Sequence, residues 1–243
     1  MKTMRNVLRY QTRSYLAGSR YIMPCAVLLV LEALLYAIAK VRIADSYTAS
    51  SAILFFVMIW MGLAYTDAED PVGEQLLVLG IGSHVRHQVY VSVFLALVGT
   101  CLAAFATAYP LVANLAFQQG GLFHTPVTVG GVLWGFLLHV AVAFMGSAVG
   151  MLLHPRIMKD RKMAVLFTLF IGLVGFIKAG IHRVIPASRA VTWLFPPMSD
   201  LSERFAGQDV FDPGSLLLML GLCLLYGAAM TAIRVWLLNR RRF

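Results

Sequence analysis

The stretch Asp67–Gln88, DAEDPVGEQLLVLGIGSHVRHQ, decides how the chain is organised. It places four acids within eight residues, followed by a short apolar run and then by a cluster of glycine, serine, histidine and arginine. Long apolar segments flank it on both sides. A stretch this polar is costly to place in hydrocarbon, so we expect it to connect two membrane-spanning segments outside the bilayer.

The composition places the flanking segments in a membrane. Of the 243 residues, 60% are hydrophobic and only 13% are charged, whereas soluble domains average about 45–50% apolar and about 25% charged residues. The net charge of +9 is typical of lysine and arginine on the cytoplasmic side of a membrane protein, so no nucleic-acid partner is expected. Three cysteines far apart in apolar runs predict no metal site. We find no repeat and no soluble domain, and expect a single transmembrane domain over residues 1–243.

Six segments approach the roughly 20 apolar residues that a spanning helix needs. They predict an all-α integral membrane protein with six transmembrane helices, at about 21–39, 50–66, 89–109, 129–153, 163–181 and 215–238. With a cytoplasmic N-terminus, fourteen of the twenty lysines and arginines lie inside. This bias predicts a multi-pass protein of a bacterial inner or plasma membrane with both termini cytoplasmic.

Two segments outside the spans have patterns of their own. Residues 1–19 carry basic residues at helical spacing, which favours an interfacial helix against membrane lipid over a disordered basic tail. Residues 179–213, between spans five and six, predict two short helices broken at Pro196-Pro197.

The opening stretch itself predicts a short helix. Asp70-Pro71 is a favourable helix start, and Glu74 in the first turn complements the helix dipole. Gly80 and Gly82 end the helix, and Ser83 can cap the next span. A helix of about ten residues, or about 15 Å, can offer its polar face to a soluble partner. A solvated loop whose helix rests on lipid is the alternative.

Taken together, the chain resembles the permease subunit of a type-2 ABC transporter, the exporter-like class with separate membrane and ATPase polypeptides. The N-terminal basic helix resembles the family's elbow helix, and the six spans keep both ends inside. The segment GEQLLVLGIGSHVRHQVYVSVFLAL resembles the coupling-helix region between spans two and three, and WLFPPMSDLSERFAG resembles the Pro-containing external hairpin before the last span. The resemblance covers nearly the full length, through loose motifs.

The resemblance implies an ATP-driven exporter in which two permease halves, identical or different, form one translocation pathway lined by spans one, two and five. Each half docks its coupling helix into a separate ATPase subunit, which binds ATP and Mg. The implied docking residues are Glu74, Gln75, Leu76, Leu77, Ser83, His84 and Arg86. The chain has no phosphate-binding loop of its own, so we expect neither a cofactor nor catalysis on it. Peptides, lipids and hydrophobic drugs all remain open as substrates.

Glu32 and His139 lie near the middle of spans one and four. Ionisable groups at membrane depth are costly and are functional candidates by default. They can face the pathway, pair with one another or be satisfied packing residues. An ATP-independent secondary transporter or an intramembrane enzyme that uses Glu32 and His139 is the alternative function. Glycine pairs spaced by four in span four predict a close helix-packing face, within the chain or between protomers.

Overall fold

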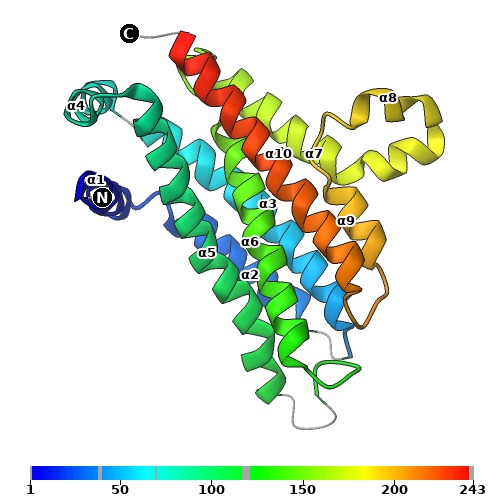
Figure 1. The fold of residues 1–243 in the computed structure, drawn as a ribbon. Helices are drawn as coiled ribbons and strands as arrows, with labels where there is room; N and C mark the ends of the chain where they lie inside the picture. Colours follow the sequence, from blue (N-terminus) through cyan, green and yellow to red (C-terminus); the bar gives the residue numbers. More distant parts are fainter. Residues whose placement is uncertain (1, 38–39, 69, 117–120, 241–243) are drawn as a thin grey trace.

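The computed structural model describes residues 2–37, 40–68, 70–116 and 121–240 as a helical bundle (Figure 1). The helices are α1 (Lys2–Ala17), α2 (Ile22–Leu35), α3 (Ile43–Ala68), α4 (Pro71–Ile81), α5 (His84–Ala116), α6 (Val129–Leu152), α7 (Arg161–Val184), α8 (Arg189–Thr192), α9 (Met198–Phe205) and α10 (Pro213–Arg240), with a 3₁₀ turn η1 (Pro186–Ser188). Within the described residues the chain is all-helical, apart from one isolated bridge between Val41 and Phe123.

Within the described residues, five helices are long and apolar enough to cross a membrane, as expected for a multi-pass membrane protein: α3, α5, α6, α7 and α10. A sixth crossing requires α1 and α2 to be counted as one broken span, bent by 77°. The first expected span is therefore represented by α2, a helix of 14 residues, which is about 21 Å at 1.5 Å per residue. Two residues of that expected span, Ile38 and Ala39, lie outside the described residues, as do Arg241 and Arg242.

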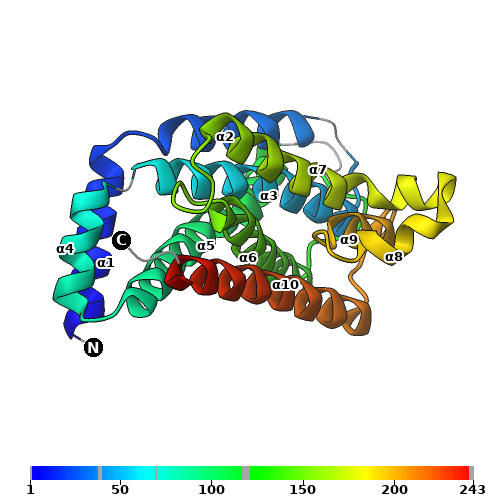
Figure 2. The ribbon, with the colours of Figure 1, turned by 90° about the horizontal axis from the view of Figure 1, so that it is seen from above.

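The start of α1 and the end of α10 lie at the same end of the bundle as α4 (Figure 1). Seen from above, α4 runs beside α1 across that end (Figure 2), and residues of both helices line one small cavity. The bend between α1 and α2 lies at residues 18–21, where Ser19 has a positive φ of 53°. Helix α1 buries Val7 and Tyr15, and Arg5, Arg9 and Arg13 are exposed at four-residue spacing. An amphipathic helix is thus present over Lys2–Ala17 of the expected segment 1–19, and Met1 lies outside the described residues.

Helix α3 is the centre of the bundle and begins seven residues before the expected span. Ser46, Tyr47 and Thr48, which precede the expected span, are buried, and the hydroxyl groups of Ser46 and Thr48 bond to the preceding turn. Ser46 Oγ donates to Ile43 O at 3.0 Å, and Thr48 Oγ1 donates to Ala44 O at 2.7 Å. Because each hydroxyl group donates a hydrogen bond to a carbonyl of its own helix, burying it costs little free energy.

The closest helix contact joins α3 to α6. A methyl group built on Gly146 would lie 2.6 Å from the carbonyl oxygen of Phe55, and one on Gly150 would collide with Ile59 O. On the α3 side, a methyl on Gly62 would lie 2.9 Å from Ser147 O. The backbones of α3 and α6 are therefore in contact at these glycines, which have no side chain to keep them apart. The glycine pair Gly146 and Gly150 packs within the chain, so the interprotomer interpretation of this pair is not needed.

The expected pair of short helices around Pro196-Pro197 is present as α8 and α9, and α8 lies at the edge of the bundle (Figures 1 and 2). Lys178 of α7 is buried and bonds Asp200 of α9 at 2.6 Å. Oδ2 of Asp212 accepts from Ser215 N–H at 2.8 Å at the start of α10. Hydrogen bonds from the Ser215 hydroxyl and backbone hold the pKa of Asp212 below its ordinary value.

Candidate functional site

Helix α4 forms for the local reasons that its sequence indicates. Asp70 is its N-cap, and Oδ2 of Asp70 accepts from Gly73 N–H at 2.9 Å. The helix ends at Gly82, which has a left-handed φ of 74° and donates its N–H to Val78 O. A left-handed residue at this position favours glycine, because a side chain there would be strained. The Ser83 hydroxyl then accepts from Arg86 N–H at 3.4 Å and starts α5.

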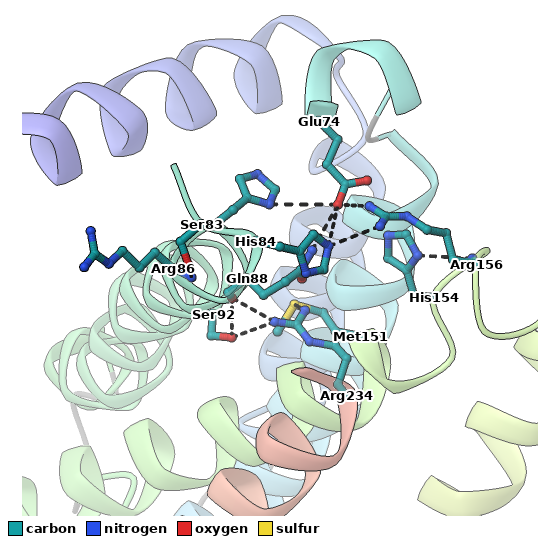
Figure 3. A network of polar contacts seen from close by, with 11 residues as sticks. Glu74, Ser83, His84, Arg86, Gln88, Ser92, Met151, His154, Arg156 and Arg234 are labelled. Atoms are coloured by element: carbon teal, nitrogen blue, oxygen red, sulfur yellow. Dashed lines mark hydrogen bonds and ion pairs between the residues drawn. The ribbon is translucent and has the colours of Figure 1, made fainter. Parts of the chain in front are cut away.

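Glu74 does not face solvent, although the sequence placed it on a docking face. Only 2% of Glu74 is exposed, and its carboxylate forms an ion pair with Arg156 of the α6–α7 connection (Figure 3). Gln88 Nε2 donates to Glu74 Oε1 at 3.1 Å. His84 Nε2 lies 3.6 Å and His87 Nδ1 3.9 Å from the same oxygen. The physical reason for the burial is this set of partners, which come from α5 and from a distant connection.

The same cluster continues into the bundle through α5. Arg234 of α10 is 1% exposed, and its Nη2 donates to Gln88 O at 2.9 Å and to Ser92 Oγ at 2.8 Å (Figure 3). Its Nη1 lies 2.8 Å from the sulfur of Met151 on α6. We call the set Glu74, His84, His87, Gln88, Ser92, Met151, Arg156 and Arg234 the α4 anchor. The α4 anchor joins α4 to α5, α6, the α6–α7 connection and α10.

With Glu74 turned inward, the outer face of α4 is apolar rather than acidic. Val72, Leu76 and Leu79 are 62%, 65% and 77% exposed. Gln75 and Arg86 are exposed beside them, whereas Leu77 and Ser83 are half-buried and His84 is buried. Of the seven residues proposed from the sequence, Gln75, Leu76 and Arg86 therefore offer exposed side chains, and Glu74 and His84 hold the helix from behind.

A long apolar groove of about 800 Å³ runs along α2, α3 and α7, which correspond to the first, second and fifth expected spans. Among the described residues that line the groove, only Asp45 is charged. Asp45 and Thr48 lie at the beginning of α3, and Ser202 comes from α9. The remaining lining residues are apolar and include three aromatic rings: Val27, Leu31, Ala49, Ala52, Ile53, Phe56, Val57, Trp60, Leu63, Val165, Leu169 and Phe176. A groove of this lining suits a long apolar molecule.

Glu32 and His139 are brought together, through a residue that the sequence did not single out. Ser50 of α3 lies between them, with its Oγ 2.6 Å from Glu32 Oε1 and 2.9 Å from His139 Nε2. All three side chains have no exposed area. In a serine hydrolase triad the acid bonds the imidazole and the nucleophile is reachable. Here the acid bonds the serine, and the imidazole Nδ1 bonds Gly135 O at 2.7 Å, so this arrangement is not a hydrolase triad.

Sequence analysis did not identify three residues that contact the predicted site residues or their neighbours: Ser50, Arg156 and Arg234. Arg156 was counted only among the basic residues that set the topology, and Ser50 was not singled out. Arg234 stood inside an apolar run, and a charge at that depth is a signal that could have found it.

No group of three or more potential metal ligands occurs within the described ranges. No family model, no curated protein and no solved structure shows a significant match to this chain.

Proposed function

We propose that the chain is the permease subunit of an ATP-driven ABC exporter, with both termini cytoplasmic. The observation that carries the proposal is the arrangement of α4, a short helix capped at both ends. Its outer face is apolar and exposed, and its Glu74 carboxylate is buried in an ion pair with Arg156. A helix that only rests on lipid needs no such anchor. A helix that receives force from a partner does, because the force must reach the helices behind it.

The partner is a soluble ATPase that holds Val72, Leu76 and Leu79 in a cleft. The chain itself lacks a phosphate-binding loop, so ATP and Mg bind on the partner. The position of α4 at the end of the bundle where α1 starts and α10 ends supports this assignment, since the basic residues favour that end as the cytoplasmic one. In this assignment α1 is the elbow helix in the headgroup layer, with its exposed arginines toward lipid phosphates.

The groove along α2, α3 and α7 forms half of the translocation pathway. It opens at the side of the bundle, and a second permease, identical or different, would close it. Its apolar and aromatic lining favours lipids, hydrophobic drugs or apolar peptides as substrates.

The test compares two triple variants that change equal numbers of exposed apolar residues. Val72→Ser/Leu76→Ser/Leu79→Ser alters the outer face of α4, and Leu217→Ser/Leu218→Ser/Leu225→Ser alters exposed positions on α10. Each is purified from its native host in mild detergent and assayed for ATP hydrolysis. We expect a stoichiometric ATPase with wild type and with the α10 variant, and its loss with the α4 variant. A chain that purifies without ATPase activity would overturn the proposal.

A second candidate is a transporter that does not use ATP, favoured by the buried Glu32–Ser50–His139 contact. Transport by the chain reconstituted alone in lipid vesicles discriminates this candidate from the exporter. Transport driven by an ion gradient without ATP would favour this candidate, and ATP-dependent transport that requires the partner would favour the exporter.

A further inference from the structure

The hydrogen bonds around His139 fix where its protons lie. The carbonyl oxygen of Gly135 can only accept, so the His139 Nδ1 that lies 2.7 Å from it carries a proton. The Nε2 atom of a neutral imidazole protonated at Nδ1 is then an acceptor. It faces Ser50 Oγ at 2.9 Å.

Ser50 has one hydroxyl proton for two neighbours. If Ser50 donates to His139 Nε2, its Oγ must accept from Glu32, which is then a carboxylic acid. If Ser50 donates to Glu32 Oε1, His139 Nε2 must supply the proton, and the pair is a carboxylate and an imidazolium. Either arrangement satisfies both contacts, at 2.6 Å and 2.9 Å. Both contain one more proton than an ionised Glu32 beside a neutral His139.

The surroundings favour the carboxylic acid. Glu32 Oε2 is buried and has no hydrogen-bond partner, and within the described chain no lysine or arginine forms an ion pair with Glu32. The titratable groups that face the site are the phenols Tyr36 of α2 and Tyr47 of α3, the latter packed edge-on to the His139 ring at 5.7 Å. A carboxylate with a bare buried oxygen is costly, whereas a neutral acid leaves only one unpaired carbonyl oxygen.

We propose that Glu32, Ser50 and His139 form a buried proton-binding site in which the carboxyl group holds one proton and Ser50 connects it to the imidazole. In a transfer along this path, the Glu32 O–H bond breaks as Ser50 Oγ takes that proton. The original Ser50 proton bonds to His139 Nε2 at the same time. The products are a carboxylate and an imidazolium, and no other reactant is needed.

The site also joins α2 and α3, two of the helices that line the groove. Helix α2 packs mainly on α3, and Glu32 is one of three residues that α2 buries. If separation of α2 from α3 admits water to the groove, Glu32 becomes hydrated, and a hydrated carboxyl group ionises at neutral pH. Proton release is therefore linked to opening between two helices that line the groove. This inference does not depend on the ATPase partner of the proposed function.

The first test is infrared spectroscopy of the purified chain in lipid nanodiscs at neutral pH. We expect the carbonyl band of a protonated carboxylic acid, which shifts in D₂O and is lost completely in Glu32→Gln. Asp67→Asn is the control, because Asp67 is ion-paired with Arg161 and should not contribute to this band. The absence of the band, or its survival in Glu32→Gln, would overturn the proposal.

The second test is ¹⁵N NMR of histidine-labelled chain, with His139 assigned from its missing signal in His139→Gln. We expect a neutral imidazole protonated at Nδ1. A doubly protonated His139 would contradict the placement of the proton on Glu32. Ser50→Ala should shift both the His139 Nε2 signal and the Glu32 carbonyl band, and it keeps the test decisive if Glu32→Gln does not fold. If neither signal moved, Ser50 would not connect the two groups.

Discussion

Replacing Glu74 by glutamine tests whether the α4 anchor holds α4 to the bundle. The change keeps the shape of the side chain and removes its charge, so the ion pair with Arg156 is lost and the contact with Gln88 is weakened. Breaking a buried ion pair by removal of one partner costs about 3–5 kcal/mol. The Arg156 side chain is 17% exposed, so water can partly hydrate its charge. We therefore expect a cost at the lower end of this range, about 3 kcal/mol.

That free energy should appear as local opening of α4 rather than as global unfolding. Each 1.4 kcal/mol is about a factor of ten, so about 3 kcal/mol corresponds to roughly a hundred-fold faster amide hydrogen exchange in Pro71–Ile81. Mass spectrometry of peptides from α4 measures this directly. Exchange in the centre of α3, which makes no contact with Glu74, should change much less.

The matched control is Asp67→Asn, which removes the ion pair with Arg161. Those side chains are 24% and 42% exposed, and exposed ion pairs contribute only about 0–1 kcal/mol. A charge exchange, Glu74→Arg with Arg156→Glu, should recover part of the protection that either single change loses. The reasoning fails if Glu74→Gln loosens α4 no more than Asp67→Asn does, or if the exchange restores nothing.

Three further predictions concern packing, capping and a buried charge. Thermal unfolding of the purified chain measures the first and third, and amide hydrogen exchange in α4 measures the second. Gly150→Ala should destabilise by about 1–3 kcal/mol, because its methyl group meets the α3 backbone, whereas Gly221→Ala, with open space around it, should be neutral or stabilising by up to about 1 kcal/mol. Asp70→Ala removes the α4 cap and should cost about 1 kcal/mol, seen as fraying of α4. Lys178→Met should be nearly neutral, whereas Asp200→Asn leaves the buried Lys178 ammonium unpaired and should cost about 3 kcal/mol. Equal effects of the members of either pair would contradict these assignments.

The boundaries of α4 were predictable because they depend on local chemistry. Asp70 accepts a backbone N–H three residues on, and Gly82 supplies the left-handed turn, so neighbouring residues contain the whole signal. The start of α3 was missed because apolar content was used to find spans. The hydroxyl groups of Ser46 and Thr48 bond their own helix, and this makes buried polar residues compatible with a spanning segment.

The inward position of Glu74 could not be predicted from the stretch that contains it. Its main partner, Arg156, lies in a connection that follows two more long helices, and only the packed bundle brings the two together. Glu32 and His139 were found because charges at membrane depth are rare. Ser50 carries no such signal, since serine is common at the ends of spans and its role depends on two other helices.

The measurement that tests the central claim most directly is reconstitution of the chain in lipid vesicles with the ATPase subunit that the proposed function requires. ATP hydrolysis and transport of a lipophilic fluorescent dye are followed together. The account predicts that Val72→Ser/Leu76→Ser/Leu79→Ser abolishes both activities by loss of the ATPase. It predicts that Glu74→Gln retains the ATPase but transports much less dye per ATP, because α4 no longer moves the bundle. Full transport by both variants, or transport by the chain alone without ATP, would contradict the account.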